Sequence, residues 1–199
     1  VATAGDSRAA LLVPGRGVVA QTCDHKPSVK AERERVERCG GEVFTQEHED
    51  GFIEERINIL GEAFPGLCMT RSLGDLAMKD YGVIAEPTVV SWQAVSEALI
   101  LVASDGVWEF LTTDQVGSIV LDALALGATY SMACAELVEQ ARRRWEEAED
   151  EYCDDISVVL AMMPHHKQNG IEGNPCCHGL HFGLSPSGSM KRAAGCSIM

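Results

Sequence analysis

The chain has 199 residues, 46% of them hydrophobic, which suits one ordinary domain and excludes a wholly disordered chain. With 30 acidic against 16 basic residues, the formal charge is −14 at pH 7, and such a surface repels phosphate backbones, so we expect no nucleic-acid partner. The longest apolar run, residues 98–103, has the size of a strand and not of a membrane span. Eight cysteines without a C-x-x-C spacing favour reduced thiols in a cytoplasmic protein.

The first half of the chain predicts short strands around one helix. A tight turn, Gly5-Asp6-Ser7-Arg8, joins the first two strands, and Ser28 is expected to cap a charged helix that ends at Gly40-Gly41. A loop is expected over residues 67–75. The expected strands lie at residues 1–4, 9–13, 18–22, 43–45 and 56–60.

The second half predicts longer elements. Helices are expected from Thr113 to about residue 126 and over residues 131–145. Strands are expected at residues 88–92, 98–103 and 156–162. Antiparallel strands with segregated helices favour an α+β layered domain over residues 1–163. Residues 164–199 are rich in Gly, Ser, Pro and His and are expected to form a disordered tail.

Four carboxylates stand where predicted strands and turns end, at Asp6, Asp105, Glu109 and Asp154. Asp105 closely follows the apolar strand 98–103, and Glu109 shares its face if the next residues make a helical turn. Asp154 precedes the strand 156–162. Buried carboxylates repel one another unless a cation neutralises them, and the hard oxygen-binding ions Mg²⁺ and Mn²⁺ do so. Turn chemistry alone is the alternative reason for an Asp beside a Gly.

Seven motifs together carry a resemblance to a known family. They occur in order as Gly5-Asp6-Ser7-Arg8, Asp24-His25-Lys26-Pro27, Glu34-Arg35-Val36 ahead of Gly40-Gly41, Met69-Thr70-Arg71-Ser72-Leu73-Gly74-Asp75, Glu86-Pro87, Ser104-Asp105-Gly106-Val107-Trp108 and Asp154-Asp155-Ile156-Ser157. Their order and spacing resemble those of the metal-dependent protein serine/threonine phosphatases (PPM, type 2C). The resemblance implies two antiparallel β-sheets packed as a sandwich with helices on both outer faces. Val1 already lies in a strand-like run, so we expect a catalytic domain truncated at its N-terminus.

The resemblance also implies a metal site and a reaction. Asp105 and Asp154 match carboxylates of a centre holding two or more Mn²⁺ or Mg²⁺ ions, and Asp6, Asp105 and the position of Glu109 match the ligands of a further, weaker metal. In the family, a metal-bridging water attacks phosphoserine or phosphothreonine in phosphorylated proteins. The expected protein is therefore a monomeric phosphatase, and the alternative is a catalytically inactive, phosphatase-like interaction module.

The sequence departs from the family pattern in three respects. The N-terminal third that supplies a bridging Asp-Gly pair, a proton-donating His and a phosphate-binding Arg is absent, so we expect no catalytic residue within residues 1–199 and no activity of this chain alone. The family usually has Asp where Glu109 stands and Asn where Asp155 stands. Trp108 is expected to support the Asp105 loop, and Arg71 to form a structural salt bridge.

The last four residues, Cys196-Ser197-Ile198-Met199, fit the C-a-a-X pattern, in which a terminal Met favours a farnesyl group on Cys196. A single lipid chain anchors a protein only marginally, so palmitoylation of Cys176 or Cys177 is the expected second signal. The tail would then tether a cytoplasmic phosphatase to the cytosolic face of a membrane. A chance tetrapeptide is the alternative.

Overall fold

The computed structural model describes residues 1–47, 53–93, 95–149 and 152–163. The chain divides into two units, Val1–His165 and His166–Met199, and all described residues belong to the first. The predicted tail, with Cys176, Cys177 and Cys196, therefore lies outside the described residues. None of the helices in the described part combines the length and the apolar character that a membrane span needs.

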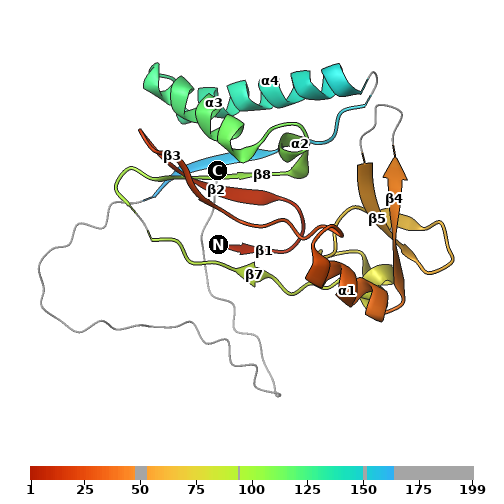
Figure 1. The fold of residues 1–199 in the computed structure, drawn as a ribbon. Coiled ribbons are helices and arrows are strands. Elements are labelled where there is room, and N and C mark those ends of the chain that lie inside the picture. The colour runs from red at the N-terminus through yellow and green to blue at the C-terminus, as the bar shows by residue number, and fades with distance from the viewer. Residues whose placement is uncertain (48–52, 94, 150–151, 164–199) are drawn as a thin grey trace, which may run out of the picture. The chain divides into compact units, whose positions relative to one another are not determined.

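The domain is built around a four-stranded antiparallel sheet in the order β3-β2-β8-β9 (Figure 1). Its strands are β2 (Arg8–Val13), β3 (Gly17–Gln21), β8 (Leu99–Ala103) and β9 (Val158–Met162). The register pairs Arg8 with Ala103 and Ala103 with Val158. The start of β2, the end of β8 and the start of β9 therefore meet at one edge of the sheet, and the loops that leave this edge carry Asp6, Asp105 and Asp154.

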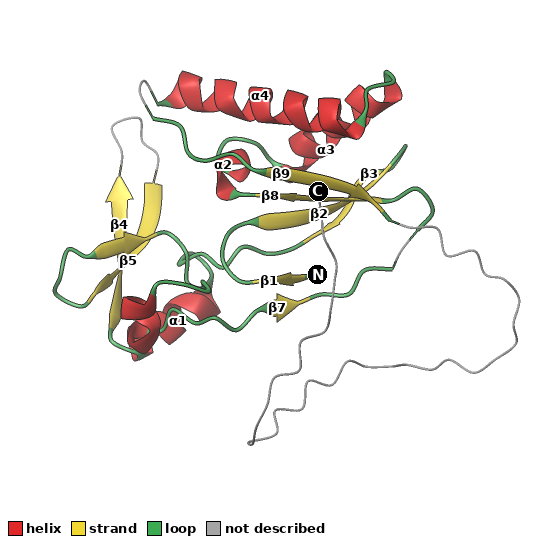
Figure 2. Ribbon diagram, turned by 180° about the vertical axis from the view of Figure 1, so that it is seen from behind, coloured by secondary structure: helices red, strands yellow, loops and turns green. Residues whose placement is uncertain are grey.

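Two helices, α3 (Thr113–Ala125) and α4 (Tyr130–Ala148), cover one face of this sheet (Figures 1 and 2). Alternate residues of β2 point to this face, where Leu12 packs with residues of both helices. The predicted cap of α3 is displaced by one residue. Thr112, and not Thr113, is the N-cap, because its side chain and that of Gln115 form a reciprocal capping box.

The other face of the sheet meets a second, two-stranded sheet of β1 (Ala2–Thr3) and β7 (Thr88–Val89). Trp92, just beyond β7, packs against Leu11 and Val13, the residues of β2 that face away from the helices. The predicted turn at residues 5–8 is therefore not a hairpin. It carries the chain from β1 in one sheet to β2 in the other, because β1 pairs with β7 and β2 with β3 and β8. The α+β class with antiparallel sheets is confirmed.

A third sheet extends from this core, with strands β4 (Gly41–Glu47), β5 (Ile53–Ile59) and β6 (Pro65–Leu67). Helix α1 (Lys30–Arg38) packs on β4, and a small core around Val36 and Ile57 includes Met78 of the 3₁₀ helix η1 (Leu76–Tyr81). The predicted cap at Ser28 is wrong. A turn closed by Val29 N–H to Lys26 O precedes the helix and makes Val29 the N-cap, whose apolar side chain has no atom that could form a capping bond.

Candidate metal centre

Two of the predicted ligands, Asp6 and Asp105, lie together at the sheet edge. One ligand atom from each, with Sγ of Cys68, forms a group whose atoms all lie within 4.8 Å of one another. Asp105 and Cys68 also line a cavity of about 410 Å³, which Asp154 and Glu109 line as well. The structure thus places all four predicted carboxylates around one site, and adds a thiol that the sequence did not indicate.

Asp6 is held by a rigid turn. The Gly5 N–H donates to Nδ1 of His25 over 3.2 Å, and Nε2 of the same ring lies 2.8 Å from Thr88 Oγ1. Burial and the nearby Arg71 guanidinium lower the pKa of His25, so the ring stays neutral and Nδ1 can accept. Gly5 has φ +127°, and a Cβ there would lie 3.3 Å from the Arg71 carbonyl oxygen, so the turn requires glycine. Asp6 is left only 6% exposed.

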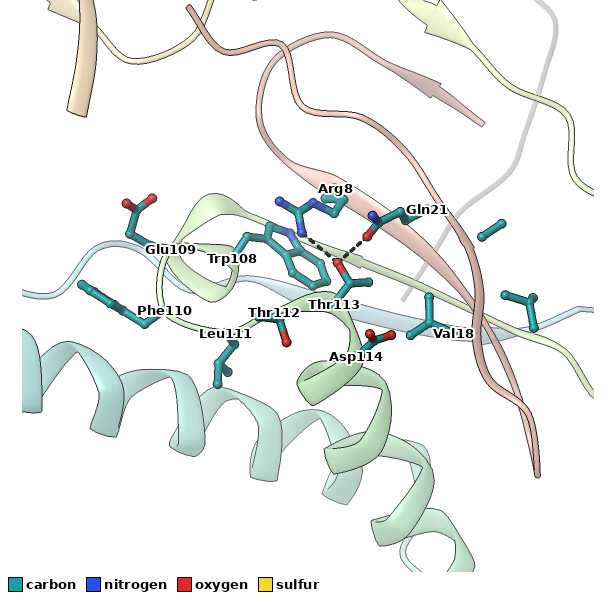
Figure 3. Close-up of a pocket in the computed structure, with 12 residues that line it drawn as sticks. Arg8, Val18, Gln21, Trp108, Glu109, Phe110, Leu111, Thr112, Thr113 and Asp114 are labelled. Atoms are coloured by element: carbon teal, nitrogen blue, oxygen red, sulfur yellow. Dashed lines mark hydrogen bonds between the residues drawn. The ribbon is translucent and has the colours of Figure 1, made fainter. Parts of the chain in front are cut away.

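Asp105 begins the short helix α2 (Asp105–Trp108), whose position two tryptophans secure. Trp108 Nε1 donates to the Ala103 carbonyl over 2.9 Å, and Trp145 Nε1 donates to the Gly106 carbonyl over 2.7 Å. Figure 3 shows the Arg8 side chain beside the Trp108 ring, with its guanidinium carbon 4.9 Å from the ring centroid, hydrogen-bonded to Thr113. The predicted supporting role of Trp108 is confirmed.

The loop that carries Asp154 packs directly on the loop of Asp105. Ser104 Oγ donates to the Asp155 carbonyl and accepts from the Ser157 N–H, each over 2.9 Å. A Cβ on Gly106 would lie 2.7 Å from the Asp155 carbonyl oxygen. The two loops therefore approach closely, and Asp105 and Asp154 line the same cavity.

The site has an excess of negative charge. Burial raises the pKa of Asp6, and the Asp105 carboxylate raises it further. Burial likewise raises the pKa of Asp105, with a further contribution from Asp154. In the described part of the chain no cationic side chain forms an ion pair with either Asp6 or Asp105. Asp6 is buried and Asp105 half-buried, and Lys26 only partly offsets their charge, so the pair fits a divalent cation; oxygen ligands suit Mg²⁺ and Mn²⁺.

Glu109 is engaged by Lys26, whose Nζ lies 3.4 Å from Glu109 Oε2. Burial opposes the charge on Lys26, but the carboxylates of Glu109 and Asp6 outweigh it and raise the pKa of this amine. Glu109 thus belongs to the wall of the cavity and lies outside the group formed by Asp6, Cys68 and Asp105.

The comparisons with known proteins agree with this geometry. Residues 1–149 match the family model described as "Protein phosphatase 2C". The chain belongs to the protein phosphatase 2C family. Among curated members of this family, it is 38% identical over 172 residues to "Probable protein phosphatase 2C 12" of Oryza sativa subsp. japonica, covering 83% of this chain and 43% of the relative. It is 39% identical over 169 residues to "Probable protein phosphatase 2C 61" of Arabidopsis thaliana, covering 82% and 50%.

The fold of this protein phosphatase 2C domain also matches solved structures. A phosphatase from a pathogenic strain of Toxoplasma gondii aligns with a TM-score of 0.65 at 26% identity, covering 82% of this chain and 49% of that one. A Caenorhabditis elegans protein described as sex-determining aligns with a TM-score of 0.64 at 25% identity, covering 81% and 36%. The chain spans about half the length of the curated relatives it matches.

Sequence reasoning missed Cys68 as a neighbour of the Asp6 and Asp105 carboxylates. The only signal was its position, directly before the motif that starts at Met69. A loop is expected over residues 67–75, which include Cys68, but a loop pattern does not predict which residues lie beside it. Burial, and then the Asp6 carboxylate, raise the pKa of the Cys68 thiol to about 11.

Proposed function

We propose that the protein is a serine/threonine phosphatase that hydrolyses phosphoserine and phosphothreonine in proteins with Mn²⁺ or Mg²⁺ at the sheet edge. The observation that carries the proposal is the convergence of Asp6 and Asp105, with Asp154 on the wall of the same cavity. Membership of the protein phosphatase 2C family supports the substrate class.

Asp6, Asp105 and Asp154 would hold the cations, and two or more ions suit this number of carboxylates. A bound divalent ion lowers the pKa of a coordinated water and offsets the charge that develops on the phosphoryl oxygens. The side chains of Lys26 and Arg56 also line the cavity. Lys26 balances Glu109, which would otherwise repel a phosphoryl group, and Arg56 is fixed by hydrogen bonds to Glu54 and the Gly66 carbonyl.

The test is hydrolysis of a phosphothreonine peptide by the whole protein, with and without Mn²⁺. Asp105→Asn and Asp154→Asn should each lower kcat/KM roughly 100-fold or more, because each removes a carboxylate that offsets cationic charge at the reacting centre. Asp122→Asn, an exposed change on α3, is the control and should leave the rate unchanged. Metal binding without any hydrolysis would instead support the inactive interaction module.

We further propose that the tail carries a lipid where Met199 is the C-terminus of the whole protein. The motif Cys196-Ser197-Ile198-Met199 and the preceding Lys191-Arg192 support farnesylation of Cys196, with Cys176 or Cys177 as the palmitoylated partner. Mass spectrometry of the C-terminal peptide from native protein is the test. An unmodified Cys196 still followed by Ser197-Ile198-Met199 would exclude the anchor.

A further inference from the structure

The thiol of Cys68 lies in the carboxylate site and outside the hydrophobic cores. Its Sγ is 3.9 Å from Asp6 Oδ2, and it lines the cavity shared with Asp105 and Asp154. Cys68 belongs to none of the described clusters of buried apolar residues. Core packing therefore does not explain why a thiol stands at this position.

The backbone on both sides of Cys68 is fixed. On one side, the Gly66 N–H donates to Asn58 Oδ1 over 2.7 Å, and the Gly66 carbonyl accepts from Arg56 over 2.8 Å. On the other side, the N–H of Thr70 donates to the His25 carbonyl over 2.7 Å, and the Thr70 hydroxyl, which donates to Glu32 over 2.6 Å, lies 2.9 Å from the same carbonyl oxygen. These contacts fix the backbone two residues to either side of Cys68, and the thiol itself donates to Asp6 Oδ2.

A second observation points to a cation at this position. Asp6 is 6% exposed, and no described cationic side chain forms an ion pair with it, although the Lys26 ammonium partly offsets the effects of burial and of Asp105 on its pKa. Its side chain is directed to the group formed with Cys68 and Asp105. A buried carboxylate that is only partly compensated is costly, and a cation among the three ligand atoms lowers this cost.

We propose that Cys68 is the third ligand, beside Asp6 and Asp105, of a site that prefers thiophilic divalent cations such as Zn²⁺ and Co²⁺ to Mg²⁺. Thiolates select such ions, whereas carboxylates alone suit Mg²⁺ and Mn²⁺. Binding forms a bond between Sγ and the metal, breaks the S–H bond and releases that proton to solvent. An ion held by all three draws the ligand atoms inward by on the order of 1 Å. This inference rests on the proposed metal binding by Asp6 and Asp105.

The experiment is a Co²⁺ titration of the 199-residue chain carrying Cys176→Ser and Cys177→Ser. These two changes remove the adjacent thiols of the tail as competing ligands. We expect a thiolate-to-cobalt charge-transfer band in the near ultraviolet. Adding Cys68→Ala should abolish the band and weaken Zn²⁺ binding roughly tenfold or more, with Mn²⁺ affinity changed by less than about twofold. Cys39→Ser, which removes an exposed thiol at the end of α1, is the matched control and should retain the band.

Two results would overturn the inference. One is Co²⁺ binding, measured by calorimetry, without the band, and the other is a Cys68→Ala chain that keeps the band or the Zn²⁺ affinity. If Cys68→Ala does not fold, alkylation of the folded chain decides: Zn²⁺ but not Mg²⁺ should slow iodoacetamide at Cys68 relative to Cys39, and equal rates contradict the proposal. A failure of the proposed function would give a different result. In that case Mn²⁺ binding would persist in the Asp105→Asn variant.

Discussion

At the scale of single residues, Glu32 organises the support behind the site. This residue of α1 is 4% exposed, and its carboxylate accepts from Arg71 in two bonds of 2.6 and 3.0 Å. It also accepts from Arg35 over 2.7 Å and from the Thr70 hydroxyl over 2.6 Å. The structural salt bridge predicted for Arg71 is confirmed, and Glu32 is the partner that the sequence did not identify.

Glu32→Gln should lower the free energy of unfolding by about 2–3 kcal/mol, because it leaves two partly buried guanidinium groups without their counter-ion. The measurement is urea denaturation at pH 7. Glu34→Gln on the same helix is the control, since Glu34 is exposed and its pair with Lys30 at 3.7 Å is a surface contact. We expect a change below about 0.5 kcal/mol there, and equal losses in both variants would contradict the assignment.

The Glu32 contribution should also depend on pH. Burial opposes its ionisation, but hydrogen bonds from Arg71, Arg35 and Thr70 hold the pKa of this carboxyl well below its ordinary value of 4.5. A folded-state pKa below the unfolded one stabilises the fold above pH 4.5, and this stabilisation is lost as the pH falls through the lower, folded value. The urea midpoints of wild type and Glu32→Gln should therefore converge below pH 4.5, and a constant difference would argue against it.

At the scale of elements, the site depends on how closely the turn from β8 into α2 approaches the loop that precedes β9. Gly106→Ala places a methyl group against the Asp155 carbonyl, 2.7 Å from the ideal Cβ position, and near Ile156 at 3.1 Å. The backbone must shift, so the variant should lose about 1–3 kcal/mol of stability and bind Mn²⁺ more weakly. Gly74→Ala, with open space around the added Cβ, is the control in the same calorimetric measurements. Unchanged Mn²⁺ affinity in Gly106→Ala would show that the loop contact does not position the ligands.

At the scale of the whole molecule, metal binding should be coupled to folding. A cation at 100 times its dissociation constant stabilises the fold by about 2.7 kcal/mol. This corresponds to a Tm increase of roughly 5–10 °C for a domain of this size. Chelation with EDTA should reverse the increase.

Asp105→Asn should change the Tm of the metal-free protein and also abolish the Tm increase caused by the metal. In EDTA it should raise the Tm by a few degrees, because it removes the repulsion of Asp105 with Asp6 and Asp154, and with Mn²⁺ it should show no further increase. Asp122→Asn should respond to Mn²⁺ like the wild type. A metal-dependent gain that persists in Asp105→Asn would place the cation elsewhere.

The sequence by itself determined the family, the α+β class and the positions of most helices and strands. The resemblance also implied Asp6, Asp105 and Asp154 as ligands of one metal centre, whereas their positions at strand ends alone left ordinary turn chemistry as the alternative. These features are local, since hydrophobic periodicity and turn residues act between near neighbours along the chain.

Only the tertiary structure decided which groups meet. Cys68 reaches Asp6 across 62 residues, and Lys26 reaches Glu109 across 83. Likewise, β1 pairs with β7 and not with the strand that follows it. Such contacts depend on sheet register and on the approach of separate loops, which are set by packing of the whole core. No pattern within a few residues of Cys68 or Glu109 encodes them.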